Sequence, residues 1–107
     1  MLKLIRGQDR LTAAIIGEID HHTARRIREE TDAVLQQDLP HELIFDFSGV
    51  TFMDSSGIGL IMGRYRLVSQ WGGSVTIAGA PSRIERILKM SGIEKLAQIH
   101  PVKEEEV

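Results

Sequence analysis

Short apolar runs alternate with segments of helical periodicity along almost the whole chain, and this alternation limits the folds open to it. The runs LTAAIIG, ELIFDF and SVTIA are rich in β-branched or aromatic residues and are typical of strands. The pattern predicts strands at residues 2–6, 11–17, 42–47, 74–78 and 96–100, and helices at residues 23–37, 56–70 and 81–90. Strands that alternate with helices form largely parallel sheets through right-handed crossovers. We therefore expect an α/β fold of order β-β-α-β-α-β-α-β.

The first two expected strands are joined by the turn Gly7-Gln8-Asp9-Arg10, which predicts a hairpin. The first strand should then be antiparallel to the second, so the sheet of about five strands should be mixed and mostly parallel. Gly72-Gly73 is expected to stop the second helix and Gly92 to cap the third, with Pro81 in the first turn of the third helix.

The three expected helices are amphipathic, which predicts the side that each turns to the core. In the first helix the inward residues are Ala24, Ile27, Thr31, Val34 and Leu35, and the water-facing residues are Arg25, Arg26, Arg28, Glu29 and Asp32. In the second helix the inward stripe is Ile58, Ile61, Met62, Tyr65 and Val68, with Leu60, Gly63, Arg64 and Leu67 lying away from it. In the third helix Ile84, Ile87 and Leu88 face inward.

Length and composition exclude several classes of function. With 107 residues we expect a single domain over residues 1–107, with the acidic tail 103–107 frayed. The net charge of −2 gives no reason to expect direct binding to nucleic acid or to an anionic membrane. The absence of cysteine excludes disulfides and thiolate chemistry. Because residues 1–7 are too short for a signal peptide and no apolar run is long enough to span a membrane, we expect a cytoplasmic protein.

Polar residues cluster where two expected strands end, which is the edge that carries ligand sites in parallel sheets. The segment Glu18-Ile19-Asp20-His21-His22 follows the second strand, and the segment from Ser48 to Ser55 follows the third. If these strands are neighbours, Asp20, His21 and His22 lie beside Asp54, Ser55 and Ser56. A third loop, Ala78-Gly79-Ala80-Pro81, follows the fourth strand at the same edge.

The segment Met53-Asp54-Ser55-Ser56-Gly57-Ile58-Gly59 carries more polar residues than a helix start needs. One residue of this type caps a helix and stabilises it by about 1 kcal/mol. A second hydroxyl can be an anion site, because free N–H groups and the helix dipole favour a phosphate there. A phosphate on Ser56 would stand beside Asp54, and at about 6 Å their repulsion is roughly 1–5 kcal/mol. At a docked interface this repulsion would act as a switch.

Gly59 and Gly63 lie inside the second expected helix, where each costs about 1 kcal/mol relative to alanine. Their spacing of four residues places them on one face. Two interpretations stay open. The glycines could allow tight packing of this helix on its own sheet or on a neighbouring helix, or they could form a flat patch that another protein approaches closely.

The pair His21-His22 suggests a general base or a metal site, but a polar loop before a helix explains it more simply. Metal sites usually need three or four protein ligands, and the nearby Glu18 and Asp20 do not complete a recognised spacing. Asp20 is well placed to cap the first helix. We therefore expect no bound metal and no cofactor.

Enzymatic chemistry is not favoured by the residues around the two serines. A nucleophile elbow, G-x-S-x-G, would need glycine at Met53 for Ser55, or at Asp54 and Ile58 for Ser56. A P-loop is absent, and the first strand is not followed by the acidic pair that a phospho-aspartate receiver needs around Asp46. A small serine hydrolase is an unfavoured alternative, and no catalytic residues are expected.

The segments Asp20-His21-His22-Thr23-Ala24, Phe52 to Gly59, Gly63-Arg64-Tyr65 and Met90-Ser91-Gly92-Ile93 together resemble the anti-sigma factor antagonists of the STAS family. The resemblance covers nearly the whole chain. Within the family it is greatest to the sporulation antagonists of endospore-forming bacteria. The DSSG segment is typical of the phosphorylatable antagonists and the DHHTA segment of the sporulation type. Members of the family often carry a longer C-terminal helix than this chain has before Val107.

The resemblance implies a regulatory mechanism in which the chemistry is done by partners. The unphosphorylated antagonist binds an anti-sigma factor that is itself a serine kinase, with ATP or ADP bound on the kinase, and frees its sigma factor. The kinase then phosphorylates the serine before the glycine, here Ser56, with Ser55 as the alternative acceptor. A serine phosphatase reverses the step. Residues expected at the partner interface are Glu18, Asp20, His21, Asp54, Ser55, Gly57, Gly59, Leu60 and Gly63. An antagonist or scaffold in general-stress sigma factor signalling is the alternative within the family.

Overall fold

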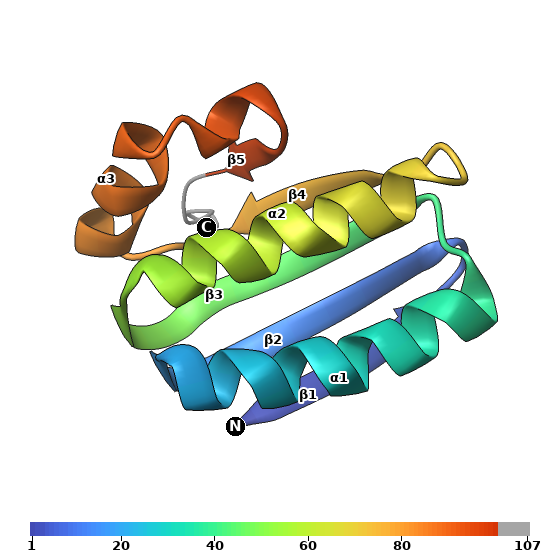
Figure 1. The fold of residues 1–107 in the computed structure, drawn as a ribbon, viewed down its shortest axis with the longest axis horizontal. Helices are drawn as coiled ribbons and strands as arrows, with labels where there is room; N and C mark the ends of the chain where they lie inside the picture. The colour runs from blue at the N-terminus through green and yellow to red at the C-terminus, as the bar shows by residue number, and fades with distance from the viewer. Residues whose placement is uncertain (101–107) are drawn as a thin grey trace, which may run out of the picture.

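The computed structural model describes residues 1–100 of the 107-residue chain (Figure 1). The strands are β1 (Leu2–Gly7), β2 (Arg10–Ile19), β3 (Glu42–Met53), β4 (Ser74–Ala78) and β5 (Gln98–His100). The helices are α1 (His21–Asp38), α2 (Ser55–Ser69) and α3 (Ser82–Met90), followed by the 3₁₀ turn η1 (Ile93–Lys95). The α/β class and the order β-β-α-β-α-β-α-β are confirmed. The expected frayed tail, residues 103–107, lies outside the described residues.

The strands form one mixed sheet in the order β1-β2-β3-β4-β5. The strand β1 is antiparallel to β2, as the hairpin prediction requires, and the other three neighbouring pairs are parallel. The helices α1 and α2 run side by side over the sheet and point the same way (Figure 1). Because each follows a parallel strand, both begin at the edge where β2 and β3 end.

The core lies between the sheet and the two long helices. Leu43, Phe45 and Phe47 alternate along the central strand β3, and none of them is exposed to solvent. Leu35 of α1 and Ile61 of α2 are equally buried, which fixes the two helices on the sheet. Burying each such side chain contributes about 1.5–3 kcal/mol.

The third strand is longer than its apolar run predicts. Although Ser48-Gly49 looks like the start of a loop, β3 continues to Met53, and only Asp54 separates it from α2. The extension stays paired with β2 beyond register shifts near Ala14 and Gly17. The expected loop from Ser48 to Ser55 is therefore wrong, because pairing with a neighbouring strand outweighs the local turn signal.

The buried face of α2 also differs from the expected stripe. Ile61 and Val68 are buried as predicted, but Leu60 and Arg64, which were expected to lie away from the core, are only 4% and 7% exposed. The reason is that α2 packs on α1 as well as on the sheet, so its buried face turns toward α1. The spacing of apolar residues alone does not reveal a second contact surface.

The C-terminal elements begin and end close to the expected positions. Pro81 is the N-cap of α3 and does not lie in its first turn, and Ser91 is the C-cap residue. Gly92 follows with φ +81°, a left-handed conformation that favours glycine. The last strand starts at Gln98, later than predicted, because η1 occupies Ile93–Lys95.

Candidate functional site

The candidate site lies where β2 and β3 end side by side. Ile19 pairs with Met53, and the backbone N–H of Asp54 donates to the carbonyl of Ile19 over 3.2 Å. The starts of α1 and α2 are thereby joined. The prediction that Asp20 and His21 lie near Asp54 and Ser56, which depended on this strand pairing, is confirmed in that respect.

Asp20 caps the start of α1. Its Oδ1 accepts hydrogen bonds from the backbone N–H groups of His22 and Thr23, at 3.0 and 2.9 Å. In return the backbone N–H of Asp20 donates to Thr23 Oγ1 at 2.9 Å, which completes a capping box. The bond from the Thr23 N–H is the main cause that lowers the pKa of Asp20. The predicted cap is confirmed, and Asp20 is fixed in place as a carboxylate.

Asp54 caps α2 and leaves both serine hydroxyls without a structural task. Its Oδ1 accepts a hydrogen bond from the backbone N–H of Ser56 at 2.8 Å. Within residues 1–100, neither Ser55 nor Ser56 uses its hydroxyl in a hydrogen bond to the protein. Ser55 is exposed and Ser56 is half-buried. Asp54 is therefore the cap, and in the described part of the chain both serine hydroxyls are left for other chemistry.

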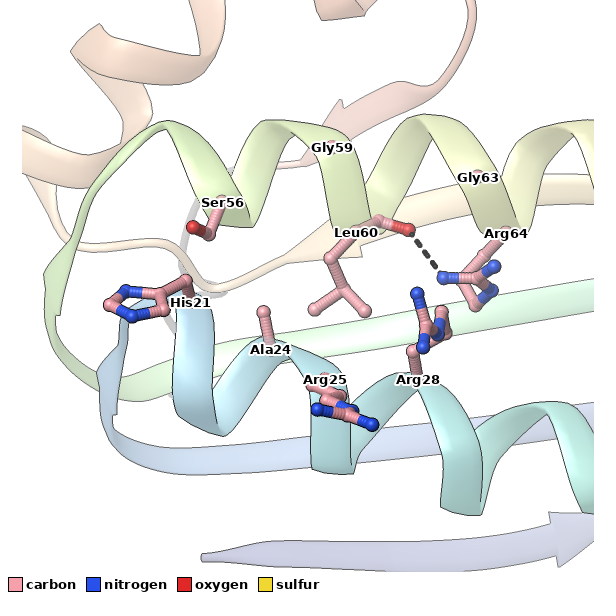
Figure 2. Close-up of a pocket in the computed structure, with 9 residues that line it drawn as sticks. All are labelled: His21, Ala24, Arg25, Arg28, Ser56, Gly59, Leu60, Gly63 and Arg64. Carbon is pink, nitrogen blue, oxygen red and sulfur yellow. Dashed lines mark hydrogen bonds between the residues drawn. The ribbon is translucent and has the colours of Figure 1, made fainter.

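A groove of about 340 Å³ separates α1 from α2 and begins at Ser56 (Figure 2). In Figure 2 the Ser56 hydroxyl lies above the His21 ring, and the groove continues from there toward Arg64. Its lining comes from both helices: His21, Ala24, Arg25, Arg28, Ser56, Gly59, Leu60, Gly63 and Arg64. One candidate acceptor serine, a histidine and three arginines thus share one surface depression.

A buried ion pair holds the far end of the groove together. Arg64 Nε of α2 lies 2.6 Å from Asp32 Oδ1 of α1, with side chains 9% and 26% exposed. Arg64 also donates to the carbonyl of Leu60 at 3.2 Å. Burial raises the pKa of Asp32 and lowers that of Arg64, in each case against the attraction of the partner. The prediction that Asp32 faces water is wrong, because Arg64 reaches across from the second helix.

The glycines of α2 have different roles. A Cβ on Gly57 would overlap the side chain of Met53, so this buried glycine is required by packing. A Cβ on Gly59 or Gly63 would meet nothing within 4 Å. Tight internal packing therefore does not explain Gly59 and Gly63, and the second interpretation, a flat surface, is favoured. They lie three and seven residues after Ser56, which places all three on one face of α2.

The remaining predicted interface residues do not all reach the groove. Glu18 lies on β2 and lines a different hollow, together with Thr23 and Arg26, on the other side of α1. Gly57 is buried and packs inside the fold, whereas Leu60 lines the groove but is only 4% exposed, so contact of either residue with a partner stays a prediction. Within residues 1–100, no cluster of three or more histidine and acidic side chains could hold a metal ion.

The sequence analysis did not assign Ala24, Arg64, Arg25 or Arg28 to the site, and of these Arg25 and Arg28 are the exposed cations of α1. It placed them correctly on the exposed side of α1 but assigned them only to water. Their spacing from His21, four and seven residues, puts all three on one helix face and could have shown a cationic stripe. That this stripe faces α2 depends on the helix packing, which the sequence does not state.

The chain belongs to the STAS domain family, whose match covers residues 4–106. Among its relatives is a Paenibacillus polymyxa protein named anti-sigma F factor antagonist, which is 36% identical over 90 residues, or 84% of this chain and 77% of the relative. A Listeria monocytogenes protein named anti-sigma-B factor antagonist is 28% identical over 100 residues, or 94% and 87% of the two chains. The resemblance to the STAS family is confirmed.

Solved structures agree on the fold. SpoIIAA in its unphosphorylated form superposes with a TM-score of 0.84, covers 98% of this chain and 90% of its own, and is 24% identical. A structure of the Bacillus SpoIIAA in the phosphorylated form gives a TM-score of 0.76 at 24% identity, over 98% and 93% of the two chains. The expected STAS-like fold is therefore confirmed. In the described part of the chain, no helix is long and apolar enough to cross a membrane.

Proposed function

We propose that this chain is an anti-sigma factor antagonist that is switched by phosphorylation of Ser56. The unphosphorylated chain binds an anti-sigma factor with serine kinase activity and releases the sigma factor. The observation that carries this proposal is the environment of Ser56. Its backbone N–H donates to Asp54, its hydroxyl has no structural partner within residues 1–100, and it lies at one end of the groove between α1 and α2. The names of the relatives, two classes of anti-sigma factor antagonist, support the same function.

The phosphorylation step needs nothing from this chain but an accessible hydroxyl. The kinase transfers the γ-phosphoryl group of ATP to Oγ of Ser56, so the bond from the γ-phosphorus to the bridging oxygen breaks and ADP leaves. The hydroxyl proton passes to a base on the kinase. A serine phosphatase later hydrolyses the new P–O bond with water and restores the hydroxyl. The chain itself acts as a regulated binding module and not as a catalyst.

We further propose the partner surface on α2 and the adjoining loop. Ser56, Gly59 and Gly63 offer a face on which a partner backbone can approach closely, because no side chain projects from the two glycines. His21 and Ser55 flank this face at the helix starts. Glu18 and Asp20 remain proposed contacts for a basic surface of the kinase, with Asp20 already fixed by its cap.

A sporulation sigma factor is the proposed target, with a general-stress sigma factor as the alternative. The Asp20-His21-His22-Thr23-Ala24 segment and the 36% identity to an anti-sigma F factor antagonist favour the first. The 28% identity to an anti-sigma-B factor antagonist keeps the second as the competitor. The two differ in the anti-sigma factor that the chain should recognise.

Displacement of a sigma factor tests the function itself. Adding the unphosphorylated chain to a purified complex of the cognate sporulation anti-sigma factor and its sigma factor should release free sigma factor in size-exclusion chromatography. We expect this release because the kinase does not bind the chain and the sigma factor at the same time. A general-stress anti-sigma factor with its sigma factor serves as the parallel sample. Release only in the parallel sample would assign the chain to the stress pathway, and release in neither would contradict the proposed function.

A further inference from the structure

The groove between α1 and α2 carries an excess of positive charge beside Ser56. Three guanidinium groups belong to its lining, and none of its nine lining residues is acidic. Two carboxylates lie close by. Glu29 is shared by Arg25 and Arg28, at 3.4 and 4.0 Å, and Asp32 is paired with Arg64. Within residues 1–100, the three guanidinium groups of the lining therefore pair with only two carboxylates.

The mouth of the groove adds the positive ends of two helices. Both helices begin there, so the positive ends of their dipoles lie near Ser56, with Asp20 and Asp54 capping N–H groups of their first turns. The His21 ring lies next to the hydroxyl of Ser56 in Figure 2.

We propose that the groove holds the phosphate of phosphorylated Ser56 on this chain's own Arg25, with Arg28 contributing further positive charge. This inference rests on the proposed function, because it concerns the phosphorylated form of that acceptor. The phosphorylated chain then keeps its phosphate bound to α1 and does not present it as a free group. The groove is occupied and neutralised in the same step.

Arg25 is the side chain best able to turn toward the phosphate. Its side chain is 75% exposed, and its pair with Glu29 is a solvent-exposed contact between residues four apart, which is a weak interaction. Helical side chains lean toward the N-terminus of their helix, so a change of rotamer carries Arg25 toward the level of Ser56. A guanidinium can bind two phosphate oxygens at once. In its present pair Arg25 contacts only one carboxylate oxygen of Glu29, at 3.4 Å.

Asp54 is the group that opposes this arrangement. Its carboxylate holds the N–H of Ser56 and repels a phosphate on the same residue. The other charged groups around the mouth are Asp20, fixed in the cap of α1, and Glu29, which loses Arg25 when the phosphate gains it. In the free chain, Arg25, Arg28 and the two helix starts outweigh these carboxylates.

A functional consequence follows for the switch. A kinase that covers the α2 face would also restrict the groove. The phosphate would then lose its contact with Arg25 but would still be repelled by Asp54. In the free chain the attraction of Arg25 offsets the repulsion from Asp54. The groove therefore stabilises the phosphorylated chain in its released state.

Phosphorus NMR on a chain with phosphoserine placed at position 56 during translation tests the proposal without any kinase. The proton affinity of the phosphate is read from its chemical shift as pH is varied. Because Arg25 favours the dianion, Arg25→Gln should increase this proton affinity about fivefold. Arg26→Gln is the matched control, since Arg26 is one residue away on α1, is exposed, and lines the hollow on the other side. It should change the affinity less than twofold.

A second readout reports the contact itself. The Nε–H resonance of Arg25 should shift between the unphosphorylated chain and the phosphoserine chain, whereas the resonance of Arg26 should not. Equal titrations for Arg25→Gln and Arg26→Gln, or an unshifted Arg25 resonance, would overturn the proposal. Either result would leave the kinase reaction and the displacement of sigma factor untouched, so the two failures are distinguishable.

Discussion

Replacing Ser56 with aspartate should weaken binding to the anti-sigma kinase about 30-fold. The reason is the carboxylate of Asp54, which is already held at the start of α2 by the backbone of residue 56. For two single charges about 6 Å apart, repulsion is about 0.7 kcal/mol at a dielectric of 80 and about 2.8 kcal/mol at 20. A partner that excludes water moves the pair toward the second value, and the difference of about 2 kcal/mol corresponds to about 30-fold in affinity.

Ser56→Asn is the matched control for this prediction, because asparagine has nearly the shape of aspartate and no charge. Isothermal titration calorimetry with the ADP-bound kinase should place Ser56→Asn within about threefold of the wild-type chain, a difference below 1 kcal/mol. The phosphate carries up to twice the charge of aspartate and should weaken binding further. Equal affinities for the aspartate and asparagine variants would show that charge at residue 56 does not control the complex.

Substitutions at Gly59 and Gly63 should affect the stability of the fold and the binding of the kinase differently. Since a Cβ at Gly59 or Gly63 meets nothing within 4 Å, Gly59→Ala and Gly63→Ala should each raise the free energy of unfolding by about 0.5–1 kcal/mol. Gly63→Leu should leave the fold intact but weaken kinase binding at least tenfold, because its side chain projects from the flat face. Chemical denaturation and calorimetry measure the two effects.

Ser69→Leu provides the control for added bulk, since Ser69 lies exposed at the opposite end of α2. It should not change kinase binding. Gly57→Ala is the contrasting variant, because its Cβ would overlap Met53 and should lower stability. If Gly63→Leu bound the kinase as well as wild type does, the partner surface would have to lie elsewhere.

Local sequence patterns were sufficient for the topology but not for the groove. Alternating periodicity predicted all five strands and three helices, and the strand pairing placed Asp20 beside Asp54. The same patterns assigned Asp32 to water and placed Arg64 away from the inward stripe of its helix. Both belong to a contact between helices that begin 34 residues apart in sequence, His21 and Ser55. Helical spacing reports how apolar a face is, and it carries no information about which other helix that face meets.

Gly59 and Gly63 show a second limit of local sequence patterns. From the sequence, tight packing and an open surface explained Gly59 and Gly63 equally well, since both interpretations tolerate the loss of helix propensity. The structure separates them, because only coordinates show what an added Cβ would touch. Gly57, which the sequence treated as part of the partner surface, proves to be the glycine that the fold requires.

Intact-mass spectrometry after incubation with ATP and the cognate anti-sigma kinase identifies the residue that accepts the phosphate. The wild-type chain and Ser55→Ala should each gain one phosphate, about 80 Da, and Ser56→Ala should gain none, because the hydroxyl at position 56 is the acceptor. A fold check by circular dichroism confirms that each variant is intact. Equal phosphate incorporation into wild type and Ser56→Ala would contradict the account.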